Sequence, residues 1–182
     1  MNSDLPKVLH EVGGAPLVVH ALLSAAPLEP ERSVVVTGHG GAAVAGVVEE
    51  FDERVRTVEQ AEQLGTAHAV LQAAPMLEGF AGNAIVLYGD TPFIRAETLE
   101  EMLAARKQHD IVVLGFEAAD PGRYGRLVME GDTLLRIVEY KDATESERRI
   151  GLCNSGVLCA DAATLLRLVS EVGNENAAGE YY

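Results

Sequence analysis

Short apolar segments alternate with longer amphipathic ones over the first two thirds of the chain. Runs of β-branched and aliphatic residues predict strands at residues 33–37, 55–58, 84–88 and 111–117. Segments with helical spacing of apolar residues precede or separate these runs, and they predict helices at residues 16–26, 41–50, 66–77 and 96–108. Strands that alternate with helices are typical of an α/β fold, in which a mixed, mostly parallel sheet has helices on both faces.

After residue 118 the pattern changes. Apolar segments on either side of Gly131-Asp132 predict a β-hairpin, and residues 151–160 predict a further strand. An amphipathic helix is expected at residues 162–172, where leucine and valine recur at helical spacing. We therefore expect a small β insertion within one α/β domain.

Composition limits the classes of partner and compartment. The 182 residues suffice for one domain, and 28 acidic against 14 basic residues give a net charge of −14. Such a surface repels polyanions, so we expect no nucleic acid and no membrane as partner. Cys153 and Cys159 lie too far apart on one predicted strand to pair with each other. Two reduced cysteines and no visible signal peptide or membrane span predict a cytoplasmic protein.

A glycine-rich turn follows the first predicted strand and permits two interpretations. Gly38, Gly40 and Ala43 fit the pattern G-x-G-x-x-[G/A], and Glu59 follows about 20 residues later, as in sites for nicotinamide dinucleotides. The alternative is a tight turn between strand and helix. The 32 residues before this strand weigh against the dinucleotide site, because such folds open with the glycine-rich unit.

Two other segments offer groups that suit a nucleotide. Asp90 follows the strand at 84–88, at the end of the strand where open α/β sheets bind ligands, although an aspartate there is often only a turn residue. Gln60 precedes a loop that ends in Gly65 and Thr66. A side-chain amide can pair with the imide edge of a base, and a glycine lets backbone approach the ring. The alternative is a solvated loop in which Thr66 caps the next helix.

Further polar candidates are less specific. Lys7 follows a proline-rigid turn, where it could meet a phosphate or only be solvated. Asn154 interrupts an apolar strand and needs a partner for its amide, either a sugar hydroxyl or a backbone group. Gly125, Glu139 and Lys141 lie in the same β insertion. No serine, cysteine or histidine arrangement indicates covalent catalysis.

Several motifs taken in order carry a resemblance to a known family. They are SDLPKVLH, QAEQLGTAHAV, LYGDTPFI, YGRLV, IVEYKDAT, CNSGV and GEYY. The chain resembles the sugar-nucleotide pyrophosphorylases over essentially its whole length. The match is nearest to the uridylyltransferase domain of the bacterial bifunctional UDP-N-acetylglucosamine pyrophosphorylase / glucosamine-1-phosphate N-acetyltransferases.

The resemblance implies a Rossmann-like nucleotidyltransferase fold and an Mg²⁺-dependent reaction. UTP and N-acetylglucosamine 1-phosphate would give UDP-N-acetylglucosamine, for cell-wall synthesis, and pyrophosphate. The implied roles are uracil and ribose recognition for Gln60, Gly65 and Thr66, contact along the nucleotide for Tyr88 and Gly89, phosphate binding for Lys7, Mg²⁺ binding for Asp90, and sugar binding for Gly125, Glu139 and Asn154. Lys141, Tyr181 and Tyr182 receive no role.

The resemblance also sets expectations for the ends of the chain. Family members open with a strand and a loop of the form L-A-A-G-x-G-T-R-M, and Met1 stands where that motif would end. A second metal ligand, an asparagine, and an acetyltransferase β-helix would lie beyond residue 182. We therefore expect a single nucleotidyltransferase domain over residues 1–182 with impaired catalysis, as a monomer or weak dimer. A noncatalytic nucleotide-binding module and an NAD-dependent oxidoreductase are the alternatives.

Overall fold

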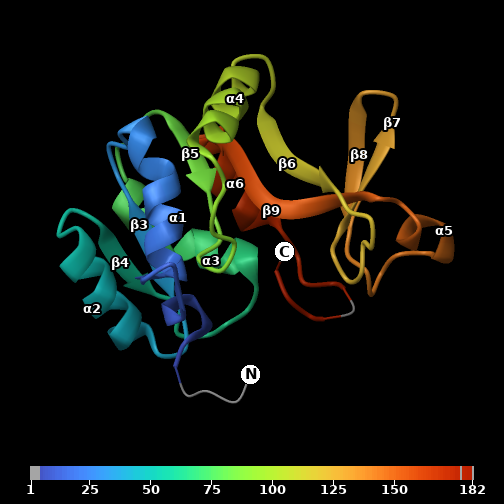
Figure 1. Ribbon diagram of the computed structural model, residues 1–182. Coiled ribbons are helices and arrows are strands. Elements are labelled where there is room, and N and C mark those ends of the chain that lie inside the picture. The colour runs from blue at the N-terminus through green and yellow to red at the C-terminus, as the bar shows by residue number, and fades with distance from the viewer. Residues whose placement is uncertain (1–4, 177, 182) are drawn as a thin grey trace.

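Two main groups of strands organise the chain, which the computed structural model describes over residues 5–176 and 178–181 (Figure 1). Strand β3 (Val34–Thr37) pairs in parallel with β4 (Arg56–Glu59). The second group is a five-stranded sheet in the order β5, β9, β7, β8, with β6 also paired to β9. Its members are β5 (Asn83–Val86), β6 (Ile111–Glu117), β7 (Arg126–Glu130), β8 (Thr133–Val138) and β9 (Leu152–Asp161).

Helices connect and cover these strands. The longer ones are α1 (Leu17–Ala25), α2 (Gly41–Phe51), α3 (Thr66–Gln72), α4 (Ala96–Arg106) and α6 (Ala162–Glu171). Shorter elements are the 3₁₀ turns η1 (Lys7–Leu9), η2 (Ala26–Leu28) and η3 (Ala74–Leu77), the two-residue strands β1 (Glu11–Val12) and β2 (Ala15–Pro16), and the one-turn helix α5 (Glu145–Arg148). The α/β fold class and the predicted strands and helices are confirmed, except that the helix predicted at 66–77 is interrupted.

The strand directions differ from the expectation of a mostly parallel sheet. Among the described strands, β3 and β4 form a parallel pair, whereas the pairings within the five-stranded sheet are antiparallel. The reason is β9, whose Ala160 faces Ala84 of β5 on one side and Ile111 of β6 on the other. Strands β5 and β6 run in the same direction. The chain returns from the β insertion between them in the opposite direction, so β9 is antiparallel to both.

The helix predicted at 66–77 is divided at Ala73. Helix α3 ends at Gln72, and η3 continues the chain as a 3₁₀ turn that has Pro75 in its first residues. A proline lacks the backbone N–H that an α-helix interior needs and crowds the preceding turn, so the α-helical hydrogen bonding ends there. Apolar spacing alone did not show this break.

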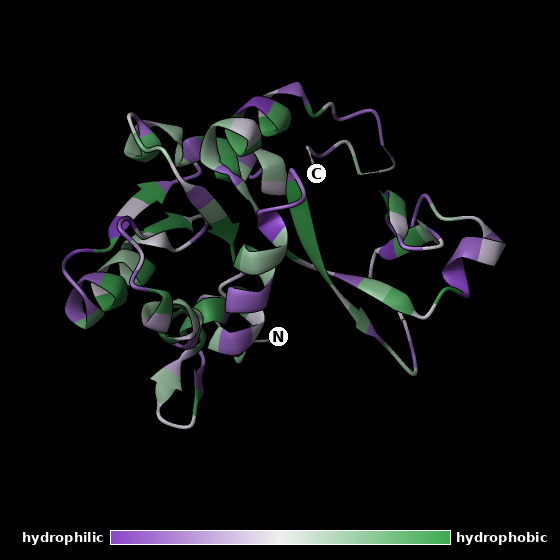
Figure 2. Ribbon diagram, turned by 90° about the horizontal axis from the view of Figure 1, so that it is seen from above, coloured by the Kyte–Doolittle hydropathy of each residue, from purple (hydrophilic) through white to green (hydrophobic). Residues whose placement is uncertain are grey.

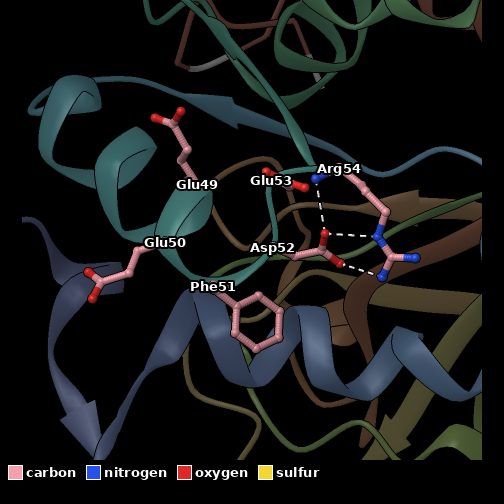
Figure 3. Close-up of a pocket in the computed structure, with 6 residues that line it drawn as sticks. All are labelled: Glu49, Glu50, Phe51, Asp52, Glu53 and Arg54. Carbon is pink, nitrogen blue, oxygen red and sulfur yellow. Dashed lines mark hydrogen bonds and ion pairs between the residues drawn. The ribbon is translucent and has the colours of Figure 1, made fainter.

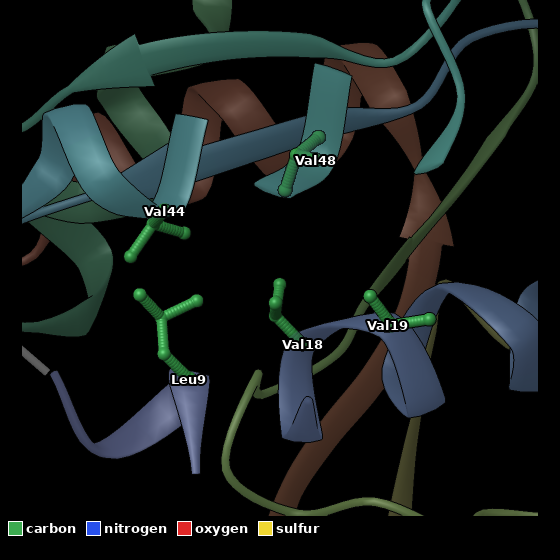
Figure 4. Close-up of a cluster of buried hydrophobic side chains, with 5 residues drawn as sticks. All are labelled: Leu9, Val18, Val19, Val44 and Val48. Carbon is green, nitrogen blue, oxygen red and sulfur yellow. The ribbon is translucent and has the colours of Figure 1, made fainter. Parts of the chain in front are cut away.

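Two apolar clusters hold the layers together. In the first, Leu9 of η1 packs against valines of α1 and α2, namely Val18, Val19, Val44 and Val48 (Figure 4). The second joins α4 to β9 through Leu99, Met102, Val157 and Cys159. Each valine or leucine removed from water stabilises the fold by about 1.5–3 kcal/mol, so these clusters fix η1 and β9 in place.

The remaining features follow from the same layers. Apolar residues gather on the strands in the middle of the molecule, and several outer loops are hydrophilic (Figure 2). Cys153 and Cys159 are both buried and free, as their spacing predicted. Within residues 5–176 and 178–181, no helix is long and apolar enough to cross a membrane.

Candidate functional site

An ion pair joins the first described turn to the loop after β5. Lys7 is the first residue of η1, and Asp90 lies four residues beyond the end of β5. The Lys7 Nζ donates to Asp90 Oδ2 at 2.6 Å, with 61% and 33% of the two side chains exposed. Such an exposed pair adds little stability. Its importance is its place, because it puts a cation and a carboxylate together beyond the carboxyl end of a sheet strand.

The Asp90 carboxylate fits a magnesium ion that is bound mainly by phosphate and water. Mg²⁺ commonly takes only one or two carboxylates together with substrate phosphates and retained waters. Among the described residues, no group of three or more His, Cys, Asp and Glu side chains forms a dedicated metal site. One oxygen of Asp90, Oδ2, already accepts from a cation, the Lys7 ammonium.

An open cavity of about 450 Å³ lies beside the loop between β4 and α3. Three residues predicted to contact the nucleotide, Gln60, Gly65 and Thr66, line it. The other lining residues are Gly38, His39, Gln63, Ala69 and Glu180. The structure therefore brings together the set that the sequence assigned to uracil and ribose. The proposed capping role of Thr66 is wrong, because Gly65 is the N-cap residue of α3 and no side chain caps this helix.

Gly65 is required by both its backbone and its neighbour. It has φ 115°, a conformation that L-residues rarely adopt, and a Cβ there would lie 2.4 Å from the Tyr181 carbonyl oxygen. The Tyr181 N–H donates to the Leu64 carbonyl at 2.7 Å, and the Ala67 N–H donates to the Tyr181 carbonyl at 2.9 Å. Tyr181, for which the sequence predicted no role, thus holds the loop between β4 and α3. Tyr182 lies outside the described residues.

Tyr88 links the cavity to the ion pair. Burial raises the pKa of its hydroxyl, a hydrogen bond with Thr66 partly offsets this rise, and the charges of Glu139 and Asp90 raise the pKa further. The next residue, Gly89, approaches Val8 so closely that a Cβ would lie 3.2 Å from the valine Cγ1. Tyr88 is therefore near both Thr66 of the cavity and Glu139 of the β insertion.

Gly156 lies against Tyr88, a contact that the sequence did not predict. Its φ is +85°, and a Cβ there would lie 2.5 Å from the Tyr88 ring. Gly156 lies within β9 where the pairing with β6 shifts register, and its N–H donates to Asn154 Oδ1 at 2.9 Å. The signal was present in the motif CNSGV, because a glycine in the interior of a strand often marks a close approach.

The residues predicted to bind sugar also come together, at the junction of β7, β8 and β9. The Asn154 N–H donates to the Gly125 carbonyl at 2.9 Å, and a Cβ on Gly125 would lie 2.7 Å from Glu139 Oε1. Partial burial raises the pKa of Glu139, repulsion from Asp142 adds to the rise, and the nearby Arg126 lowers it. The side-chain oxygen of Asn154 accepts from the Gly156 N–H. Its side-chain NH₂ group carries the donors that a sugar hydroxyl would use.

The glycine-rich turn after β3 favours the tight-turn interpretation over a dinucleotide site. Gly40 is the N-cap of α2 with φ 73°, and a Cβ there would lie 2.6 Å from Pro6 Cγ. The Gly41 N–H donates to the Gly38 carbonyl at 3.0 Å, which closes the turn. The chain itself therefore fills the space beside these glycines, although Gly38 lines the cavity that contains Gln60.

A second hollow lies at the other end of α2, and none of the candidate residues from the sequence lines it. It is lined by residues 49–54, where a hydrogen bond from the Arg54 side chain lowers the pKa of Asp52 to about 2 (Figure 3). Helix α2 spans eleven residues, which places this hollow about 15 Å from the cavity at its start. The bidentate pair of Arg54 with Asp52 closes the turn between α2 and β4.

Sequence comparison gives the family and the extent of the match. Residues 1–151 match the MobA-like NTP transferase domain. Two strains of Cereibacter sphaeroides and Jannaschia sp. have proteins called "Bifunctional protein GlmU" that are 68%, 67% and 62% identical over the whole chain. The chain spans 40% of the length of each of these relatives.

Solved structures support the fold at lower identity. HddC from Yersinia pseudotuberculosis, complexed with GMP-PN, has a TM-score of 0.72 and 22% identity, over 91% of this chain and 72% of that one. A UDP-glucose pyrophosphorylase complexed with UDP-glucose has a TM-score of 0.74 and 17% identity, over 97% and 75%. The family match over residues 1–151, the similarity of this whole chain to part of each GlmU relative, and the shared fold agree. The chain belongs to the MobA-like NTP transferase domain family.

Proposed function

We propose that this chain is an Mg²⁺-dependent uridylyltransferase domain. It would transfer the uridylyl group of UTP to N-acetylglucosamine 1-phosphate, forming UDP-N-acetylglucosamine and releasing pyrophosphate. The observation that carries this proposal is the Lys7–Asp90 pair, which lies next to Tyr88 between two sets of polar residues. One set, with Gln60, lines the cavity, and the other, with Glu139, lies at the junction of β7, β8 and β9.

The reaction needs alignment and charge neutralisation more than a protein nucleophile. An oxygen of the sugar phosphate attacks the α-phosphorus of UTP, the bond to the β-phosphate oxygen breaks, and pyrophosphate leaves with the electron pair. Lys7 would bind phosphate oxygens and hold them in line. Asp90 would hold Mg²⁺, which when bound neutralises charge on the phosphates.

The two ends of the product fit the two polar sets. The amide of Gln60 and the backbone at Gly65 and Thr66 suit a uracil and its ribose. Glu139 and the Asn154 NH₂ group suit sugar hydroxyls, and Gly125 leaves space beside the Glu139 carboxylate. Tyr88 lies between them, so its ring would face the middle of the nucleotide sugar.

Ligand binding tests this assignment directly on the chain. Thermal unfolding is followed with UTP, UDP-N-acetylglucosamine, other UDP-sugars and NAD, each with and without Mg²⁺. We expect the uridine nucleotides to raise the unfolding temperature, with a larger effect of UTP when Mg²⁺ is present, because binding to the folded state alone stabilises it. Protection by NAD and none by uridine nucleotides would instead support the dinucleotide alternative.

The role of Asp90 needs a matched pair of variants. Asp90→Asn removes the charge at the proposed metal position, and Asp132→Asn removes a carboxylate in the exposed turn between β7 and β8. We expect only Asp90→Asn to abolish the Mg²⁺-dependent part of UTP binding and of pyrophosphate release. Unchanged Mg²⁺ dependence in Asp90→Asn would reject the metal assignment. Saturable UTP binding without pyrophosphate release would favour the noncatalytic alternative.

A further inference from the structure

The amide group of Gln60 is held by two acceptors of the protein itself. Its Nε2 donates to the Gly65 carbonyl at 3.0 Å and lies 2.9 Å from His68 Nδ1. The Gly65 carbonyl also accepts from the Ala69 N–H in the first turn of α3, at 3.0 Å. Because a carbonyl only accepts, it must face the nitrogen of the Gln60 amide rather than its oxygen.

This arrangement determines which atom of Gln60 remains for a ligand. A primary amide has two N–H donors, and here one is directed at Gly65 and the other at His68. The oxygen Oε1 is then the group that this cavity-lining side chain can offer. An acceptor at this position prefers a base edge that carries a ring N–H, as uracil does at N3. It disfavours cytosine, whose N3 is itself an acceptor.

We propose that His68 is a positioning residue that fixes the Gln60 amide with Oε1 available to the base, and so sets the preference for uracil over cytosine. The inference rests on the proposed uridylyltransferase function and adds the orientation of the base-reading group. The carrying observation is the contact of Gln60 Nε2 with His68 Nδ1 beside its bond to Gly65.

The proposal requires one tautomer of His68. A neutral imidazole has one donor and one acceptor nitrogen, so Nδ1 must be bare and Nε2 must carry the hydrogen. Gln72, one turn further along α3, has its Nε2 3.1 Å from His68 Nε2, and the same nitrogen donates to the His68 carbonyl at 3.1 Å. For the required tautomer the Gln72 amide must rotate so that its oxygen accepts the Nε2–H, and it then gives up the bond to the His68 carbonyl.

The opposite orientation of Gln60 is disfavoured by two contacts at once. A flipped amide would place Oε1 against the Gly65 carbonyl oxygen and against the bare Nδ1 of His68. Two hydrogen bonds would be replaced by two contacts between acceptors. Without an acceptor at position 68, only the Gly65 contact would oppose the flip, and the amide could then present N–H donors to cytosine.

A pair of substitutions separates this role from simple packing. His68→Leu replaces the imidazole with an apolar side chain that has no acceptor, whereas His68→Asn places an amide oxygen near the position of Nδ1. The dissociation constants for UTP and CTP are measured for the wild type and both variants. For His68→Leu we expect the preference for UTP over CTP to fall about tenfold, mainly through weaker UTP binding. This is the change expected when one hydrogen bond no longer holds the Gln60 amide in its orientation. We expect His68→Asn to retain most of the preference.

Two results would overturn the proposal. One is an unchanged UTP-to-CTP preference in folded His68→Leu, and the other is an equal loss in His68→Asn, which would assign the effect to the ring rather than to its acceptor. Should His68→Leu fail to fold, His68→Gln takes its place, because its amide extends toward the Nε2 position and leaves no acceptor at Nδ1.

Nitrogen NMR of the ligand-free wild type separates this proposal from the proposed function. We expect the His68 signals to show hydrogen on Nε2 and a bare Nδ1, and hydrogen on Nδ1 would overturn the inference whatever the protein binds. Failure of UTP to bind the wild type would refute the uridylyltransferase function. The orientation of Gln60 would still be judged by the His68 tautomer.

Discussion

Replacing Gly65 by alanine is the sharpest test of how the loop between β4 and α3 is held. The residue has φ 115° and ψ 178°, a region occupied essentially by glycine alone. Holding alanine there costs about 1–3 kcal/mol. The new methyl group would also lie 2.4 Å from the Tyr181 carbonyl oxygen and 2.7 Å from its nitrogen. These are backbone atoms, so the whole segment at Tyr181 would have to move.

The cost of that movement follows from the hydrogen bonds at Tyr181. Displacement breaks the bonds from Tyr181 N–H to Leu64 and from Ala67 N–H to Tyr181. Each backbone hydrogen bond contributes about 1 kcal/mol net. With the backbone strain, Gly65→Ala should lower the free energy of unfolding by about 3 kcal/mol or more. For a chain of this length, that corresponds to a fall of about 6–12 °C in the unfolding temperature.

Urea unfolding with a matched variant separates the backbone strain of alanine from the cost of displacing Tyr181. Gly79 has φ +70° and no atom within 4 Å of its added Cβ, so Gly79→Ala should cost only the backbone strain, about 1 kcal/mol. Hydrogen exchange at the Ala67 and Tyr181 amides should accelerate in Gly65→Ala and remain slow in Gly79→Ala. Equal losses of stability in the two variants, with both amides still protected, would refute the reasoning.

Three further predictions concern the other polar sets. Gly156→Ala should lower the unfolding temperature and weaken UDP-sugar binding, because its methyl group would lie 2.5 Å from the Tyr88 ring; unchanged binding would contradict this placement. Partial burial raises the pKa of Glu139 above its ordinary 4.5, so its protonated form favours folding, and that contribution is lost as pH rises through the raised value. In thermal scans at several pH values, Glu139→Gln should therefore gain stability relative to the wild type as the pH rises through the raised pKa. Parallel pH profiles of the two proteins would show that the pKa of Glu139 is not raised. Thr144→Ala should cost about 1 kcal/mol in urea unfolding, because Thr144 and Glu147 form the capping box of α5, and no change in midpoint would show that this helix end is held otherwise.

The order of elements was largely readable from the sequence because it depends on local patterns. Alternating apolar runs and helical spacing located β3, α2, β6 and α6 to within a few residues. The sequence did not reveal the direction of β9 relative to β5 and β6, since strand pairing depends on contacts between residues far apart in the chain. It also missed the break at Pro75, where apolar spacing and backbone geometry point to different structures.

The candidate residues were found as separate motifs, and only folding showed which of them meet. The ordered motifs identified Gln60, Asp90 and Glu139 and the family to which the chain belongs. The sequence could not show that Lys7 pairs with Asp90 across 83 positions, because a side chain's surroundings come from distant segments. For the same reason, the sequence could not show the contact of His68 with Gln60 or the close approach of Tyr181 to Gly65. Local composition thus determined the elements and the chemical groups, and long-range packing decided their orientation and their partners.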